Sequence, residues 1–132
     1  MASKIVGINY SKLYQKKSKL EIEAMFNNYV YNPRYLVAED NSKILGFAGY
    51  IQSWMDYNFY QMFWVNVLPE HQGKGIGTTL VKRIIQLIKN KKDAYFILLT
   101  TTKPKFYERF GFKIMMKYRN NYVLMILDLK KK

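Results

Sequence analysis

Apolar and polar positions along the chain alternate in blocks that predict strands, interrupted by one long helical pattern. Residues 59–67 are apolar at both odd and even positions, as in a central strand covered on both faces. From Ile76 onward the apolar positions recur at spacings of three and four, which predicts an amphipathic helix. Its apolar positions are Ile76, Leu80, Val81, Ile84, Ile85 and Ile88. A buried strand that leads directly into a helix is typical of an α/β protein.

Further elements are predicted on both sides of this unit. A short first strand is predicted over residues 5–10, and the capping box Ser18-x-x-Glu21 predicts the start of a helix that Pro33 would end. The remaining predicted elements are the strands 35–39, 44–51, 94–100, 112–118 and 122–129 and a short helix over 103–110. Gly111 is a suitable left-handed stop for that helix. We predict one domain over residues 1–132 of the α/β class, with a mixed, mostly antiparallel sheet flanked by helices.

Composition narrows the chemistry open to this domain. The chain has no cysteine, which excludes disulfides, thiolate metal ligands and a cysteine nucleophile. Its one histidine, His71, cannot build a histidine cluster, so no metal site is predicted. No apolar run reaches membrane-spanning length and no N-terminal signal pattern is present, so we expect a cytoplasmic protein that does not bind a membrane.

The net charge of +13, from 22 basic and 9 acidic residues, raises the question of nucleic-acid binding. The longest basic runs are short: Lys16-Lys17 with Lys19, Lys89 with Lys91-Lys92, and Lys130-Lys131-Lys132. No nucleic-acid motif accompanies them. We therefore favour a solvated, lysine-rich surface over a nucleic-acid interface, and expect the charge to favour an anionic partner.

Three glycines at alternate positions, Gly73, Gly75 and Gly77, separate the central strand from the helix. Glycine lets the backbone approach a ligand closely, and the helix N-terminus behind it offers N–H groups and a positive dipole end. The sequence therefore predicts a pyrophosphate site. The spacing does not match a P-loop, and a dinucleotide fingerprint would place its last glycine at Thr78 or Leu80.

The pattern Gln72-x-x-Gly75-x-Gly77, after a strand ending in Val67-x-Pro69, resembles the acyl-CoA loop of the GNAT family of N-acetyltransferases. The segment 106–112, which reads F-Y-E-R-F-G-F, is similar to a second landmark of that family. The resemblance covers roughly residues 35–129 by element order. It implies an acetyl-CoA-dependent enzyme whose two central strands splay to admit the pantetheine arm.

The same resemblance implies roles for individual residues. The backbone of Val67 and Leu68 would pair with the pantetheine amides. Pyrophosphate contacts, mostly through main chain, would come from Gln72, Gly73, Lys74, Gly75, Ile76, Gly77 and Thr78. Tyr107 would protonate the departing thiolate, since a phenol is protonated at neutral pH and can donate. Packing roles are expected for Phe106, Phe110 and Phe112, and a surface position for His71.

The general base is not identified by the sequence. Where several members of the family carry a glutamate on the central strand, this chain has Gln61, whose neutral amide cannot take a proton. Glu23, Glu39 and Asp56 are the nearest carboxylates in the pattern, and none has a motif behind it. Water relayed from backbone carbonyls or from tyrosines is an equal alternative.

We therefore predict an N-acetyltransferase that moves an acetyl group from acetyl-CoA directly to an amine. A small-molecule amine is the first choice of acceptor, and a protein N-terminus or lysine is the second. A basic nucleic-acid-binding module and an acyl-CoA-binding domain without turnover are the alternatives from other classes. A homodimer is left open.

Overall fold

The computed structural model describes residues 33–53, 55–56 and 58–130. The predicted strand 5–10 and the helix opened by Ser18 and Glu21 lie outside these residues. The described strands are β1 (Arg34–Asp40), β2 (Lys43–Gln52), β3 (Phe59–Val67), β4 (Phe96–Thr101), β5 (Lys113–Lys117) and β6 (Val123–Asp128). The helices are α3 (Ile76–Lys89), α4 (Pro104–Glu108) and the single 3₁₀ turn η1 (Pro69–His71).

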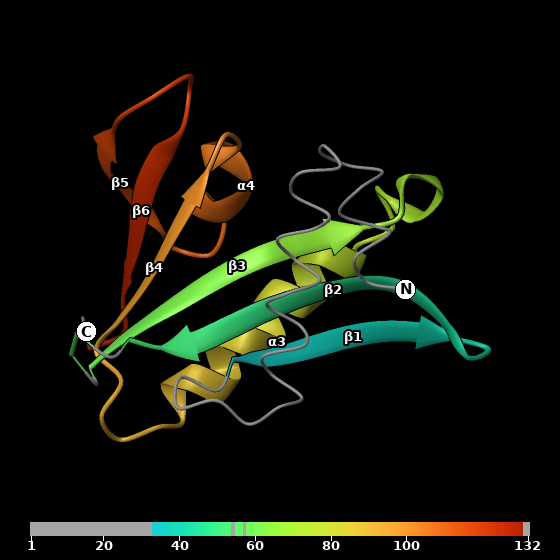
Figure 1. Cartoon of the computed structure of the whole chain (residues 1–132), viewed down its shortest axis with the longest axis horizontal. Helices are drawn as coiled ribbons and strands as arrows, with labels where there is room; N and C mark the ends of the chain where they lie inside the picture. Colours follow the sequence, from blue (N-terminus) through green and yellow to red (C-terminus); the bar gives the residue numbers. More distant parts are fainter. Residues whose placement is uncertain (1–32, 54, 57, 131–132) are drawn as a thin grey trace.

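The six strands form one sheet in the order β1-β2-β3-β4-β6-β5 (Figure 1). Only β3 and β4 pair in parallel, and the other neighbours are antiparallel. The parallel pair follows from the chain path, because the strand–helix–strand connection through α3 returns the chain in the same direction. The predicted mixed, mostly antiparallel α/β sheet is confirmed, with β3 in its interior.

The strands predicted over 35–39 and 44–51, and over 112–118 and 122–129, form two hairpins, and each hairpin turns through a pair of left-handed residues. Asn41 and Ser42 have φ of 50° and 65° between β1 and β2. Asn120 and Asn121 have φ of 46° and 69° between β5 and β6. Two consecutive positive φ values match the right-handed twist of antiparallel strands, and asparagine tolerates them well. Gly111, with φ of 99°, follows α4 as expected.

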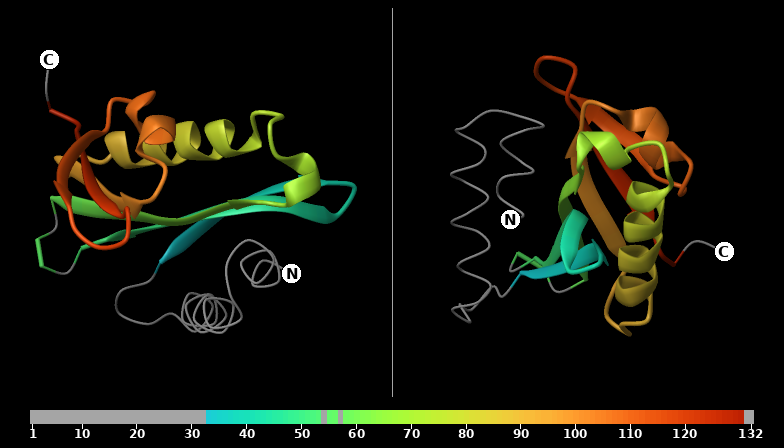
Figure 2. Two further views of the ribbon diagram at one scale, coloured as in Figure 1. Left: turned by 90° about the horizontal axis from the view of Figure 1, so that it is seen from above. Right: turned by 90° about the vertical axis from the view of Figure 1, so that its right-hand side faces the viewer.

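The core lies between α3 and one face of the sheet (Figure 2). The predicted apolar stripe of α3 supplies it: Leu80, Val81, Ile84 and Ile88 are buried, whereas Ile76 and Ile85 are half-buried against the same cluster. The sheet contributes alternate residues of its central strands, among them Ala48, Tyr60, Met62, Ile97, Leu99 and Met125. Among the described helices, none is long and apolar enough to cross a membrane.

Asp93, in the loop between α3 and β4, forms hydrogen bonds that connect the strands at the end of the sheet remote from Gly73 and Gly75. Its Oδ2 accepts a hydrogen bond from Gln52 Nε2 at 3.0 Å, and its backbone carbonyl accepts one from Asn58 Nδ2 at 2.6 Å. The Tyr60 hydroxyl donates to Asp93 Oδ1 at 3.4 Å. Burial, and secondarily the neighbouring Asp93 carboxylate, raises the pKa of Tyr60 to about 12. The start of β4 is thereby held against β2 and β3.

Candidate active site

The strands β3 and β4 are paired at one end and separate toward the other. Their register contains three pairs, from Phe59 with Phe96 to Gln61 with Leu98. Beyond that last pair, β3 continues to Val67 and β4 continues to Thr101, but the two strands no longer pair with each other (Figure 1). The sheet therefore has a gap between its two central strands, as the predicted splay requires.

A bulge in β3 accompanies this separation. Trp64 has a positive φ of 52°, and the β2–β3 register shifts between Phe47 and Gly49 opposite it. An extra residue on one strand bends that strand and strengthens its local twist. The bulge falls on the part of β3 that is no longer paired with β4, so it turns the end of β3 away from its neighbour.

Beyond the bulge, backbone hydrogen bonds decide which residue faces the gap. The Leu68 N–H donates to the Leu45 carbonyl on the β2 side at 2.8 Å. Since successive residues of a strand present their backbone groups to opposite sides, the Val67 N–H and carbonyl are directed toward the gap. Of the two residues predicted to pair with pantetheine, Val67 has the required direction, whereas the Leu68 N–H is already bonded within the protein.

The glycine loop begins directly after η1 and ends at α3. Gly73 and Gly75 have φ of 81° and 84°, and a Cβ on either would meet no described atom within 4 Å. Glycine is therefore needed here for the left-handed backbone rather than for space. Gly75 is the N-cap of α3 and no side chain caps this end, so the N–H groups of the first turn, which includes Gly77 and Thr78, have no acceptor within the helix.

The same helix end has the electrostatic character of an anion site. No acidic residue lies in the first turn of α3, which is 14 residues long. Its dipole places a partial positive charge at Ile76, Gly77 and Thr78. The exposed Lys74 ammonium lies nearby, 3.4 Å from His71 Nδ1. The predicted pyrophosphate residues are thus gathered in one loop at the open end of the gap.

The Gln72 side chain connects the glycine loop to β3 through a hydrogen bond. Its Nε2 donates to the Val67 carbonyl at 3.0 Å, and its backbone N–H donates to the Pro69 carbonyl at 3.2 Å. The side chain therefore ties the glycine loop to the end of β3. The resemblance implied a contact of Gln72 with pyrophosphate, and the structure adds a hydrogen bond that sequence reasoning did not anticipate.

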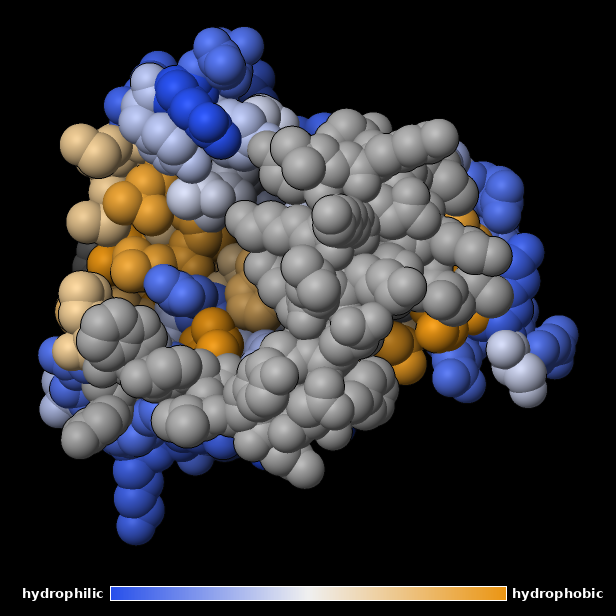
Figure 3. All heavy atoms as spheres, viewed as in Figure 1, coloured by the Kyte–Doolittle hydropathy of each residue, from blue (hydrophilic) through white to orange (hydrophobic). Residues whose placement is uncertain are grey.

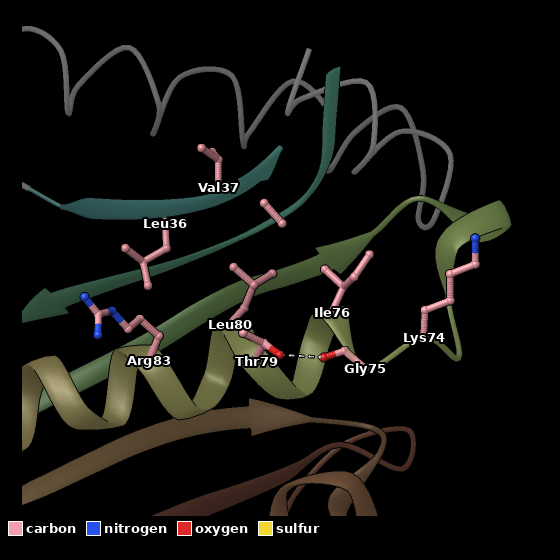
Figure 4. Close-up of a pocket in the computed structure, with 9 residues that line it drawn as sticks. Leu36, Val37, Lys74, Gly75, Ile76, Thr79, Leu80 and Arg83 are labelled. Atoms are coloured by element: carbon pink, nitrogen blue, oxygen red, sulfur yellow. Dashed lines mark hydrogen bonds between the residues drawn. The ribbon is translucent and has the colours of Figure 1, made fainter. Parts of the chain in front are cut away.

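A hollow of about 480 Å³ lies on the β1 side of α3 (Figure 4). Its lining residues are Leu36, Val37, Ala38, Lys74, Gly75, Ile76, Thr79, Leu80 and Arg83. Arg83 was not singled out from the sequence. It lies one helical turn beyond Thr79, whose hydroxyl donates to the Gly75 carbonyl at 3.0 Å, so a spacing of four from this residue would have found it. Arg83 and Lys74 make two cations at this hollow.

The second motif packs against the first. A Cβ on Gly77 would lie 3.6 Å from Phe106 Cζ and 3.7 Å from Val67 Cγ2. The start of α3, the end of β3 and α4 therefore meet at one point, although 29 residues separate Gly77 from Phe106. Tyr107, the predicted proton donor, is on α4 and its half-buried ring lies 4.9 Å from that of Phe106 and 5.9 Å from that of Phe112.

The phenylalanines of the second motif pack as expected. Phe112 is buried in the core cluster, and Phe106 and Phe110 are half-buried against it. The Arg109 guanidinium carbon lies 5.6 Å and 5.7 Å from the ring centroids of Phe106 and Phe110. These contacts orient α4 and, through it, Tyr107.

The candidate bases are not brought to the glycine loop. Glu39 is on β1, two strands away from the gap, and Asp56 is in the loop at the opposite end of β3, where its Oδ1 accepts from the Asn58 N–H at 2.9 Å. Glu23 lies outside the described residues. Gln61 belongs to the last β3–β4 pair, at the point where the strands separate. His71 is half-exposed in η1, beside the loop rather than in the gap.

A family model described as an acetyltransferase (GNAT) domain matches residues 32–114, more than half of the chain. The chain belongs to the GNAT acetyltransferase family. Solved structures of this family have the same fold. One, assigned to the GNAT acetyltransferases and from Desulfovibrio desulfuricans, has a TM-score of 0.79 at 17% identity over 96% of this chain and 87% of its own.

Two other similar GNAT structures contain coenzyme A. An aminoglycoside 6'-N-acetyltransferase complexed with coenzyme A has a TM-score of 0.78 at 19% identity, over 98% of this chain and 89% of its own. The PaiA N-acetyltransferase from Thermoplasma acidophilum, also in complex with coenzyme A, has a TM-score of 0.68 at 23% identity, over 89% and 73%. No curated protein sequence matches the chain significantly.

Proposed function

We propose that this GNAT protein is an N-acetyltransferase that transfers an acetyl group from acetyl-CoA to a small-molecule amine. The observation that carries the proposal is the meeting of an uncapped α3 N-terminus with the open end of the β3–β4 gap. A pyrophosphate fits the first feature and an extended pantetheine arm fits the second. The complexes of two similar proteins with coenzyme A support the same ligand class.

Each part of the cosubstrate has a proposed partner. The N–H groups of the first turn of α3, with Lys74, bind the pyrophosphate through charge-assisted hydrogen bonds. The backbone of Val67 pairs with the pantetheine amides as an added strand would, because its N–H and carbonyl are directed into the gap, where the carbonyl also accepts one hydrogen bond from Gln72 Nε2. The thioester is then positioned between β3 and β4, where an acceptor amine reaches it.

The transfer itself needs no covalent enzyme intermediate. The neutral amine attacks the thioester carbonyl, a C–N bond forms, and collapse of the tetrahedral intermediate breaks the C–S bond. The nitrogen loses one proton to water, and the leaving thiolate gains one from the hydroxyl of Tyr107, which solvent then reprotonates. The products are the acetylated amine and the free coenzyme A thiol.

A binding and turnover experiment tests this function. Calorimetry with acetyl-CoA should show binding to the wild type and a loss of at least about 100-fold in affinity for Gly77→Asp, which places a carboxylate beside the pyrophosphate. Gln86→Glu, an equal charge change on an exposed position of the same helix, should bind normally. Thiol release should depend on an added amine. Absence of acetyl-CoA binding contradicts the proposal, and binding without release indicates an acyl-CoA-binding domain.

A further inference from the structure

The face of the sheet opposite α3 lines the other side of the β3–β4 gap. Tyr60 and Met62 of β3 are buried in the core beneath α3. Because side chains alternate along a strand, Phe59, Gln61 and Phe63 project from the opposite face. Two of the three are aromatic, and the Phe59 ring lies edge-on to that of Phe96 on β4 at 5.4 Å.

Strand pairing extends this face across the rest of the sheet. Leu98 of β4 is beside Gln61 on one side and Ile126 of β6 on the other. One row nearer the open end of the gap, Thr100 pairs with Leu124, which pairs with Met116 at the sheet edge. We call Phe96, Leu98, Leu124, Ile126 and Met116 the outer patch. Figure 3 shows apolar side chains gathered on this face over β4, β6 and β5.

The outer patch is accessible. Its members on β4 and β6 are half-buried, and Met116 is 57% exposed. Apolar side chains grouped beside an opening in the sheet are a favourable surface for an apolar ligand, whose binding would remove them from water.

The described carboxylates lie away from the gap end of this face. Asp93 and Asp128 are at the paired end of β3 and β4, where Asp93 is bonded to Gln52 and Tyr60 and Asp128 Oδ1 accepts from the Lys130 N–H at 2.9 Å. The others belong to β1 and its turn, to loops or to α4: Glu39, Asp40, Asp56, Glu70 and Glu108. Asp128 is on this face, paired with Phe96, and Glu108 is next to Tyr107 on α4, but the described residues in the rows of Gln61 and Thr100 include no carboxylate.

The residue at the point where the strands part, Gln61, also limits the acceptor. Its amide cannot remove a proton, and the described residues paired in its row, Leu98, Ile126 and Lys113, include no carboxylate, so we take the acceptor amine to react in the fraction that is already neutral. At pH 7 that fraction is about 0.04% for an alkyl amine of pKa about 10.4 and roughly 11% for an α-amine of pKa about 7.9. A weakly basic amine therefore has an advantage of a few hundred-fold.

We infer that the acceptor is a weakly basic amine borne on an aromatic or aliphatic body, with that body on the outer patch. The inference rests on the proposed function and names its acceptor class. The apolar body is recognised by Leu98, Leu124 and their neighbours, while the nitrogen is directed into the gap beside Gln61.

Four amines distinguish the requirement for a weakly basic nitrogen from the requirement for an apolar body. L-Phenylalaninamide has a weakly basic nitrogen and an aromatic body, glycinamide has the nitrogen without the body, and 2-phenylethylamine has the body with a strongly basic nitrogen. An aminoglycoside is the polycation. With acetyl-CoA saturating at pH 7, we expect kcat/KM for L-phenylalaninamide to exceed that for glycinamide by at least about tenfold and that for 2-phenylethylamine by about 100-fold. The difference in kcat/KM between L-phenylalaninamide and 2-phenylethylamine should become smaller as the pH rises toward 10.

A variant tests the place of binding. Thr100→Asp puts a carboxylate on an exposed position of this face, in the row of Leu124, and should lower kcat/KM for L-phenylalaninamide at least about fivefold while raising that for the aminoglycoside. Gln86→Glu, on the other side of the molecule, should change neither of these two kcat/KM values. An aminoglycoside preferred by the wild type, or glycinamide equal to L-phenylalaninamide, overturns the inference and leaves the transferase standing. Calorimetry that detects no acetyl-CoA binding overturns the proposed function as well.

Discussion

At the scale of single residues, two glycines that are two positions apart at the start of α3 have opposite requirements. Gly75 is left-handed, with φ of 84°, whereas Gly77 is helical with room for a methyl group against Phe106 and Val67. We expect Gly75→Ala to lower the free energy of unfolding by about 1–2 kcal/mol because of left-handed strain. Gly77→Ala should raise it by about 0.5–1 kcal/mol through helix propensity. Denaturant unfolding of both variants measures this, and equal shifts would contradict it.

The hydroxyl of Tyr107 is the second residue-scale prediction. Tyr107→Phe keeps the ring contacts with Phe106 and Phe112 and removes the proton donor. If the thiolate is protonated from here, kcat should fall about 10²–10⁴-fold, while KM for acetyl-CoA and the unfolding midpoint change little. Tyr118→Phe, at an exposed tyrosine of the β5–β6 hairpin, is the matched control. If kcat of Tyr107→Phe is unchanged while the chemical step is rate-limiting, Tyr107 contributes only to packing.

At the scale of elements, the hydrogen bonds of Asp93 hold β2, β3 and the start of β4 together, and the burial of Tyr60 beside Asp93 makes the stability of the fold depend on pH in the alkaline range. Tyr60, only 3% exposed, has its pKa raised to about 12 from the usual tyrosine value of about 10. The unfolded chain therefore releases this proton at lower pH than the folded protein. The contribution is complete below pH 10 and is lost as the pH rises from about 10 to about 12.

Tyr60→Phe tests that dependence. The variant should show a shallower fall in unfolding free energy between pH 10 and pH 12 than the wild type, because it has no proton to release there. Urea unfolding at several alkaline pH values measures the slope. Parallel curves for the two proteins would mean that other groups cause the decline.

At the scale of the whole molecule, the net charge of +13 acts on a polyanionic cosubstrate. Exposed charges are screened over about 10 Å at 0.1 M salt. KM for acetyl-CoA should therefore rise several-fold between about 0.05 and 0.5 M salt. A short acetyl thioester without the nucleotide, used as alternative donor, should show much less change. The same salt response for both donors would contradict electrostatic attraction of the nucleotide.

Local patterns predicted most of the described fold. The run 59–67 coincides with β3, the apolar stripe from Ile76 coincides with α3, and the asparagine-rich hairpin turns have the left-handed backbone that their residues favour. Several boundaries differ by one or two residues; β4, for example, begins at Phe96 and not at Ala94, which is buried in the preceding loop. These features depend on neighbours a few positions away, and such preferences can be read along the chain.

The glycine loop was predicted for the same reason, since glycine at positions 73 and 75 reflects a backbone conformation that other residues adopt at a cost. The assignment of these residues, of Val67 and of Tyr107 to acetyl-CoA stays a prediction. So do the small-molecule acceptor and a homodimer. What the sequence determined by itself is thus the elements, their order and the family to which they belong.

Tertiary structure decided how the elements form a site. The gap exists because β3 and β4 stop pairing after Gln61, and the direction of Val67 depends on a bond between Leu68 and Leu45. Gly77 lies close to Phe106 although the two are far apart in the chain. Arg83 lines the hollow beside the glycine loop because of how α3 packs on the sheet. Pairing partners, strand divergence and side-chain direction are non-local, because each is chosen by competition among contacts that form only when the whole sheet is assembled.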